Sequence, residues 1–212
     1  MSVKAMKKIG VLVSGGGTNF QSLIDTIHNK YGEIAVVISN NHSAFGLERG
    51  EAAGIPAVAI NPKGFPTNEA FDQKIIEILR GYGVELVVLA GYMKIITPEF
   101  VKAYPNAIIN IHPALIPSFC GEGFYGMHVH QAVIDYGVKV TGATVHFVNE
   151  VADGGPVILQ ETVAVDDDDT PESIQQKVLK IEHELLPKAV KAFCLDQLTV
   201  EGRLVKNRNA SN

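Results

Sequence analysis

Asn110 and His112 are the side chains in this sequence best suited to catalysis. They follow the apolar run Ala107–Ile109, which predicts a buried strand, and Pro113 comes directly after them. Side chains at positions i and i+2 of a strand project from the same face of the sheet. An imidazole can transfer a proton near neutral pH, and a carboxamide N–H can donate to a developing oxyanion. The pair therefore predicts an acyl-transfer site at the end of a strand.

Asp153 is a third candidate, for which two interpretations remain open. It begins the Asp-Gly-Gly-Pro turn that ends at Pro156, between two later strands. An Asp in such a turn can simply hydrogen-bond its own backbone. Alternatively, the carboxylate contacts His112, favours the protonated imidazole and raises its pKa.

A metal site is not expected. His128, His130 and His146 do not have the spacing of a zinc motif, and no cysteine accompanies them.

The glycine-rich segment Ser14–Asn19 joins the first expected strand to the first expected helix. Consecutive backbone N–H groups at a helix N-terminus bind anions, although a tight turn with no ligand remains the alternative. The segment lacks the Gly-Lys-Ser/Thr of nucleotide-hydrolysing loops, and Phe20 occupies the place of the third glycine in a dinucleotide fingerprint. These departures favour a single sugar phosphate.

Short apolar runs alternate with longer amphipathic segments, a pattern typical of βαβ units. The expected strands are Ile9–Ser14, Ile34–Ser39, Ala57–Ile60, Leu86–Ala90, Ala107–Ile111, Val140–Val148 and Val157–Val165. The expected helices are Asn19–Lys30, Gly46–Ala53, Asn68–Tyr82, Pro98–Ala103, His130–Asp135 and a long one from about Asp169 to Cys194, bent at Pro187. A terminal hairpin is expected over Leu198–Val205, and residues 207–212 are expected to fray.

This order predicts an α/β fold with one doubly wound, mostly parallel sheet of about seven strands and a Rossmann-like N-terminal half. Residues 1–206 are expected to form a single domain. The ligand crevice should lie between the carboxyl ends of the strands that end near Ser14 and Ile111.

Composition excludes several classes of protein. The formal net charge of -5 argues against nucleic acid as a partner. The two cysteines, Cys120 and Cys194, argue against a disulfide framework, and no apolar run is long enough to span a bilayer. We expect a soluble, cytoplasmic protein.

Six blocks of sequence, taken in order, resemble the phosphoribosylglycinamide formyltransferases, folate-dependent enzymes of purine biosynthesis. The blocks are Val13–Asn19, Leu89–Ile95, Asn110–Pro117, Gly142–Val148, Asp153–Ile158 and Glu182-His183. The resemblance covers nearly the whole chain. It implies the formyltransferase fold and transfer of the formyl group of 10-formyltetrahydrofolate, the co-substrate, to the amine of glycinamide ribonucleotide, without a metal.

The resemblance also implies roles for individual residues. Asn110, His112 and Asp153 would be catalytic. Gly17, Thr18 and Asn19 would hold the phosphate of glycinamide ribonucleotide, with Glu182 near its ribose. Met93, Lys94, Ile95 and Ile96 would line the folate pocket, with contacts from Asn110 and Asn68. The partners would be these two small molecules, with no nucleic acid or membrane, and the enzyme would be a monomer or a homodimer.

Some positions depart from the pattern of the family. Ala114 stands where Ser is usual, while Lys94 and Asn68 each replace an Arg, so the contact of Asn68 with folate is in doubt. The loop Cys120–Gly126 is longer than in some relatives. A cis peptide is predicted at Ile116–Pro117, between the catalytic strand and this loop.

Three rival functions stay open. A formyltetrahydrofolate deformylase would need an additional N-terminal domain, and a methionyl-tRNA formyltransferase would need a C-terminal tRNA-binding domain and positive charge. A non-catalytic sugar-phosphate-binding protein would leave the Asn110, His112 and Asp153 trio without a purpose.

Overall fold

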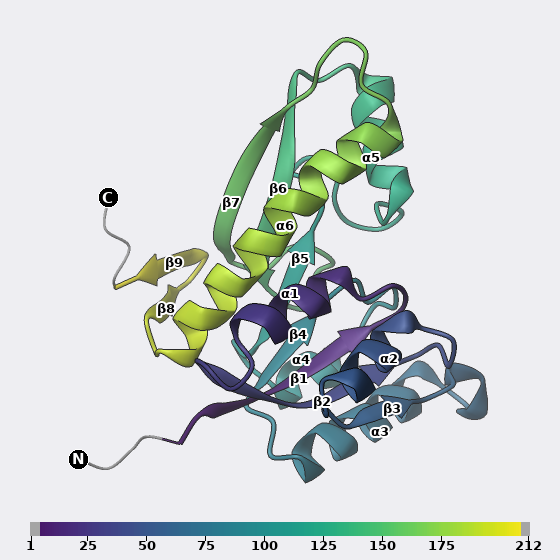
Figure 1. Ribbon diagram of the computed structural model, residues 1–212, viewed down its shortest axis with the longest axis vertical. Coiled ribbons are helices and arrows are strands. Elements are labelled where there is room, and N and C mark those ends of the chain that lie inside the picture. Colours follow the sequence, from purple (N-terminus) through teal and green to yellow (C-terminus); the bar gives the residue numbers. More distant parts are fainter. Residues whose placement is uncertain (1–4, 209–212) are drawn as a thin grey trace.

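One sheet organises the whole chain. The computed structural model describes residues 5–208, and its nine strands join in the order β3-β2-β1-β4-β5-β6-β7-β9-β8 (Figure 1). The strands are β1 (Lys7–Val13), β2 (Gly32–Ser39), β3 (Ala57–Ala59), β4 (Leu86–Leu89), β5 (Ile108–His112), β6 (Val140–Phe147), β7 (Val157–Ala164), β8 (Leu198–Glu201) and β9 (Leu204–Asn207). The sheet exceeds the expected seven strands because the predicted terminal hairpin, β8–β9, joins its edge through the pair Val157–Leu204. The last strand includes Asn207, which the sequence assigned to a frayed tail; residues 209–212 lie outside the described part.

The N-terminal half of the sheet is parallel, and the order of its strands creates a crevice. Strands β3, β2, β1, β4 and β5 run in the same direction. The chain leaves β1 towards β2 and later returns to the other side of β1 as β4. The order of the strands therefore reverses between β1 and β4. Open α/β sheets bind ligands at the carboxyl ends of the strands beside such a reversal. Strands β6 and β7 then add in antiparallel fashion next to β5.

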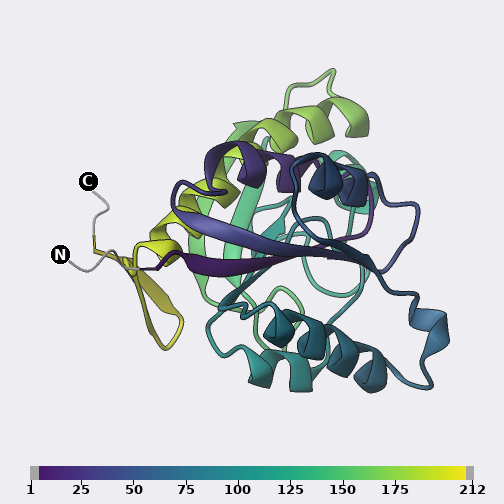
Figure 2. The same ribbon diagram turned by 60° about the horizontal axis from the view of Figure 1, so that its bottom comes forward.

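Helices cover both faces of this sheet. They are α1 (Thr18–Thr26), α2 (Phe45–Ala52), α3 (Asn68–Gly81), α4 (Pro98–Ala103), α5 (Met127–Tyr136) and α6 (Pro171–Cys194), with a short 3-10 turn at Pro62–Gly64. Figure 2 shows α1, α2 and α6 on one face and α3 with α4 on the other. The alternation of a strand explains the two cores: Val11 and Val13 pack towards α1 and α6, whereas Leu12 packs towards α3.

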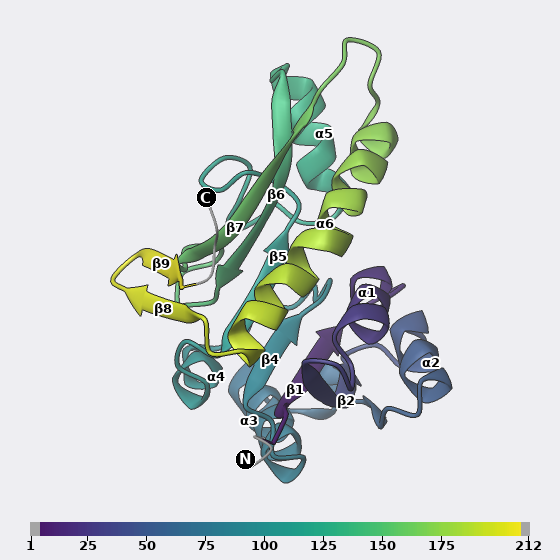
Figure 3. The same cartoon turned by 60° about the vertical axis from the view of Figure 1, so that its left-hand side comes forward.

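The longest helix, α6, lies along the second half of the sheet (Figure 3). Its start follows the capping rules: Thr170 Oγ1 accepts from Ser173 N at 3.2 Å, and Ser173 Oγ accepts from Thr170 N at 2.9 Å. Pro171 occupies the first turn, where its missing N–H costs nothing. The helix continues to Cys194 with Pro187 inside it, as the sequence predicts. It packs against β6, which is buried from Thr141 onward.

Two further findings concern the chain as a whole. The predicted cis peptide at Ile116–Pro117 is confirmed. Among the helices of residues 5–208, none combines the length and apolar character that a membrane crossing requires.

Candidate active site

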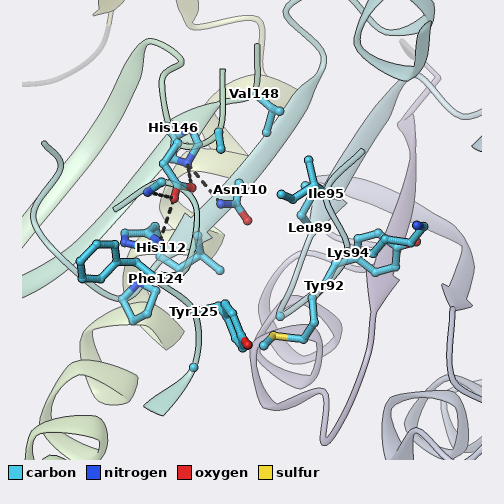
Figure 4. A pocket seen from close by; sticks show the side chains of 18 of the residues that line it. Leu89, Tyr92, Lys94, Ile95, Asn110, His112, Phe124, Tyr125, His146 and Val148 are labelled. Atoms are coloured by element: carbon cyan, nitrogen blue, oxygen red, sulfur yellow. Dashed lines mark hydrogen bonds and ion pairs between the residues drawn. The ribbon is translucent and has the colours of Figure 1, made fainter. Parts of the chain in front are cut away.

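A cavity of about 570 Å³ opens at the carboxyl ends of β1, β4 and β5 (Figure 4). Its lining includes Thr18 and Asn19 after β1, Gly91–Ile96 after β4, Asn110–Pro113 in and after β5, Gly121–Gly126, His146, Asp153 and Glu182. The expected convergence of the glycine-rich loop and His112 on one crevice is therefore confirmed. Gly17 and Asn68 are the predicted site residues that do not line this cavity; Gly17 directly precedes two that do.

Four polar side chains lie close together in the wall of the cavity, and we call them the reactive cluster: Asn110, His112, His146 and Asp153. The two histidines are buried, and Asn110 and Asp153 are half-buried. The antiparallel pairing of β5 with β6 places Asn110 directly opposite His146. Asp153 reaches both histidines, with Oδ2 at 3.6 Å from His112 Nδ1 and Oδ1 at 3.5 Å from His146 Nε2. Of the two interpretations of Asp153, the contact with His112 is the one found.

Hydrogen bonds to backbone carbonyls determine where the imidazole protons lie. His146 Nδ1 is 2.8 Å from the Phe147 carbonyl, which can only accept, so this nitrogen carries a proton. In the neutral ring His146 Nε2 then accepts from Asn110 Nδ2, at 3.2 Å. The amide of Asn110 is thereby oriented, and its second N–H is free to meet a ligand. In the same way His112 Nε2 donates to the Phe119 carbonyl at 2.8 Å, which leaves the lone pair of neutral His112 on Nδ1.

Burial decides the pKa of His112. Removal of the ring from water lowers its pKa, while the Asp153 carboxylate and the Phe119 carbonyl act in the opposite direction and His146 lowers it further. Together these effects place the pKa of His112 below its ordinary value of 6.5. The expectation of a raised His112 pKa is therefore wrong, because burial outweighs the carboxylate, although Asp153 itself acts in the expected direction.

Asp153 stays ionised despite its own burial. Burial acts to raise the pKa of its carboxyl, but His146 and His112 in their protonated forms and the N–H of Gly121 lower it more, so that the pKa lies below 3.8. The Gly121 N–H donates to Asp153 Oδ2 at 2.8 Å. The long loop after β5 thus supplies one backbone group to His112 and one to Asp153.

The glycine-rich end of the cavity contains a buried carboxyl group. Glu182 of α6 accepts from Asn19 Nδ2 of α1 at 2.7 Å. Burial raises the pKa of Glu182 to about 7, and the hydrogen bond from Asn19 lowers it only in part. A carboxyl group in this state has a free oxygen for a hydroxyl group of a ligand, near the anion-binding helix terminus of α1.

The opposite wall is the loop Gly91–Ile96, which we call the apolar loop. Its apolar side chains Met93 and Ile95 are 51% and 68% exposed. The loop is fixed near its two ends, since Met93 N donates to Ser14 Oγ at 2.9 Å and Thr97 N donates to Asp72 Oδ2 at 2.6 Å. In Figure 4 Leu89 and Ile95 face the reactive cluster across the cavity.

Asn68 lies beside the apolar loop without lining the cavity. Its side-chain oxygen accepts from Lys94 Nζ, and that ammonium group also lies over the Phe71 ring. Lys94 does line the cavity. Asn68 therefore reaches the site only through Lys94.

Sequence reasoning missed two members of the site. His146 was considered only as a metal ligand, and the Phe119 carbonyl was not considered. The register of β5 with β6 is the signal that would have found His146. Among the residues described, no group of three or more His, Cys, Asp and Glu side chains is arranged to hold a metal ion.

Comparison with known proteins shows the family to which the chain belongs. Residues 7–190 match the formyl transferase family. A phosphoribosylglycinamide formyltransferase of Haemophilus influenzae is 40% identical over 201 residues, which are 94% of this chain and 92% of that protein. The trifunctional purine biosynthetic protein adenosine-3 of Bos taurus is 42% identical over 185 residues, 86% of this chain but 18% of that longer protein.

A solved structure extends the likeness to three dimensions. Glycinamide ribonucleotide transformylase 1 from Symbiobacterium toebii superposes with a TM-score of 0.91 at 42% identity, over 97% of this chain and 95% of that one. The protein belongs to the formyl transferase family, and over nearly its whole length it is similar to phosphoribosylglycinamide formyltransferases.

Proposed function

We propose that this protein transfers the formyl group of 10-formyltetrahydrofolate to the amine of glycinamide ribonucleotide, giving formylglycinamide ribonucleotide and tetrahydrofolate in purine biosynthesis. The observation that carries the proposal is the reactive cluster, which combines an amide donor, a neutral imidazole and an ionised carboxylate. It lies between a glycine-rich loop and an exposed apolar loop. Each feature suits one part of this reaction.

The two substrates take opposite ends of the cavity. The phosphate of the ribonucleotide lies at Gly17, Thr18 and Asn19, where backbone N–H groups at the start of α1 favour an anion, and its ribose hydroxyls reach Glu182. The pterin of the folate packs against Met93–Ile96, whose exposed apolar side chains lose water contact on binding. Asn68 acts on the folate only by holding Lys94.

Asn110 acts on the formyl oxygen. The amine attacks the formyl carbon and the carbonyl oxygen becomes an oxyanion in a tetrahedral intermediate. The free N–H of Asn110, oriented by His146, donates to this oxygen. Loss of one such donor costs roughly 3 to 4 kcal/mol of transition-state stabilisation in other acyl-transfer enzymes.

His112 carries the proton. In its neutral form, the Nδ1 lone pair takes a proton from the attacking amine through a water molecule, and the imidazolium so formed lies beside the Asp153 carboxylate. When the intermediate collapses, the proton passes to the leaving nitrogen of tetrahydrofolate. The lowered pKa of His112 suits it to release the proton again near neutral pH.

The remaining parts of the proposal have their own tests. The reaction requires no metal, because the formyl group is already activated on the folate nitrogen, and full activity in EDTA would support this. The net charge of -5 supports an enzyme without nucleic-acid or membrane partners. We expect a monomer or a homodimer, and light scattering would distinguish the two.

The two free cysteines suit a cytoplasmic location, which cell fractionation would test. Residues 1–206 form one domain, for which a single unfolding transition is expected.

The decisive experiment mixes the protein with glycinamide ribonucleotide and 10-formyltetrahydrofolate and follows the appearance of tetrahydrofolate. Turnover that requires the ribonucleotide supports the proposal. Equal turnover without the ribonucleotide would indicate a hydrolase instead. Binding of the ribonucleotide with no turnover would indicate a binding protein.

A further inference from the structure

Three successive carbonyl groups of the glycine-rich loop are tied to helices. The Gly15 carbonyl accepts from Gly46 N at 3.0 Å, and the Gly17 carbonyl accepts from Gln21 N at 2.9 Å. Between them, the Gly16 carbonyl accepts from Arg49 Nε at 2.8 Å. Two of the three donors therefore belong to α2, which lies beside α1 on the same face of the sheet (Figure 2).

Fixing these carbonyls also fixes the N–H groups that follow them. In a trans peptide the carbonyl oxygen and the next N–H point in opposite directions within one plane. The N–H groups of Gly16, Gly17 and Thr18 are thus turned away from the donors, and within residues 5–208 they have no hydrogen-bond partner. Three successive unpaired N–H groups in a loop before a helix are suited to an anion.

Helix α2 is in direct contact with the loop. A Cβ atom on Gly17 would lie 2.7 Å from the Cα of Gly46, so no side chain fits between loop and helix. Gly17 also has a φ of +69°, a conformation that favours glycine. This close approach is what allows Arg49, one turn further along α2, to reach the Gly16 carbonyl.

The guanidinium group of Arg49 is held in a fixed orientation. Besides Gly16, it donates through Nη1 to Gln21 Oε1 at 2.9 Å, and it lies over the Phe45 ring at 4.9 Å from the centroid. Its charge extends to α6, where it adds to burial in lowering the pKa of His183, the neighbour of Glu182. A fixed positive charge therefore stands directly behind the loop.

We propose that Arg49 is a positioning residue for the phosphate of the ribonucleotide. Arg49 holds the Gly16 carbonyl away from the anion, so that the Gly17 N–H faces the anion. It also places a positive charge near the anion site before the anion binds. That the anion is the phosphate of the ribonucleotide rests on the proposed function, whereas the orientation of the loop does not.

Two substitutions separate orientation from charge. Arg49→Lys keeps the charge but lacks the Nε–H and the planar fork that bond Gly16 and Gln21 together. Arg49→Gln removes both. We expect Arg49→Lys to weaken binding of the ribonucleotide about tenfold and Arg49→Gln by up to about a hundredfold, in line with hydrogen bonds to charged groups. In both variants KM for the ribonucleotide rises while kcat and KM for the folate stay near wild type.

Lys191→Gln is the matched control. Lys191 also lies over an aromatic ring, with Nζ 4.2 Å from the centroid of Tyr31, and its loss changes the net charge by the same amount. Tyr31 comes just before β2, at the end of the sheet opposite the glycine-rich loop. This variant should bind the ribonucleotide as wild type does.

Calorimetry with three ligands completes the test: the ribonucleotide, its phosphate-free riboside and ribose 5-phosphate. Arg49 variants should lose affinity for both phosphorylated ligands and keep wild-type affinity for the riboside. Unchanged affinity of both variants for the phosphorylated ligands would overturn the inference. So would an equal loss for the riboside, or a wild-type protein that binds no phosphorylated ligand. If wild type binds ribose 5-phosphate but does not formylate the ribonucleotide, the proposed function fails, while the variants still decide the role of Arg49.

Discussion

The reactive cluster and the apolar loop face each other across one cavity but are built in opposite ways. His112 and His146 are 4% and 1% exposed, on strands of the sheet, and every ring nitrogen has a polar neighbour within 3.6 Å. In the apolar loop, by contrast, Met93 and Ile95 are 51% and 68% exposed. The cluster is organised before any ligand arrives, whereas the loop leaves apolar surface exposed to solvent.

This difference assigns different kinetic effects to the two regions. Groups that are already in place and act on developing charge affect the chemical step. Apolar side chains that gain contacts on binding affect substrate and transition state alike and therefore change KM. Substitutions in the cluster should change kcat, and substitutions in the loop should change KM for the folate.

The largest effect is expected for Asn110→Ala. In the proposed mechanism this amide donates to the formyl oxygen, so without it kcat should fall about 100- to 1000-fold, with KM for both substrates changed little. Steady-state kinetics measures this, with the thermal midpoint as the folding control. A kcat within threefold of wild type would remove Asn110 from the proposed mechanism.

The buried carboxyl group of Glu182 should also make the stability of the folded protein depend on pH. The pKa of Glu182 is raised from 4.5 to about 7, so the folded protein holds this proton more tightly than the unfolded chain. The resulting stability is present below pH 4.5 and is lost as the pH rises to about 7 and above. The loss is about 3 kcal/mol, since one pKa unit corresponds to about 1.4 kcal/mol.

Glu182→Gln should abolish this component. Urea unfolding at pH 5 and pH 8 should show a smaller drop in the free energy of unfolding for the variant than for wild type. Glu184→Gln is the matched control, because Glu184 lies on the same helix with its side chain 71% exposed. If Glu182→Gln and wild type lose equal stability between the two pH values, Glu182 is ionised without cost in the folded protein.

A smaller effect is expected at the apolar loop. Ile95→Ala removes apolar surface that the pterin would cover, worth about 1 to 2 kcal/mol, so KM for the folate should rise roughly 5- to 30-fold with kcat unchanged. Leu204→Ala removes the same number of carbons at a residue that is 67% exposed on β9, and should change neither constant. A fall in kcat for Ile95→Ala with unchanged KM would contradict the distinction between the two regions.

The sequence predicted the parts of the site that depend on local pattern. Asn110 and His112 were found because a period of two on a strand places them on one face. The glycine-rich loop was found because its glycines lie between a strand and a helix. In each case the relevant geometry extends over a few neighbouring residues.

What the sequence could not predict depends on pairing between distant segments. Whether Asp153 closes its turn or reaches His112 was undecided, because both arrangements suit the same Asp-Gly-Gly-Pro residues. The part played by His146 follows from the antiparallel register of β5 with β6, which no local pattern specifies. The attachment of β8–β9 rests on the single pair Val157–Leu204, so two strands were missing from the expected sheet.

Asp153 stabilises the positive charge that His112 gains when it takes up a proton, even though burial keeps the pKa of the ring below its ordinary value. This role can be measured by titrating His112 by NMR in wild type and in Asp153→Asn. We expect a His112 pKa below 6.5 in wild type and a still lower one in the variant, because the amide keeps the shape of the side chain but not its charge. A well-folded Asp153→Asn protein in which His112 titrates as in wild type would contradict it.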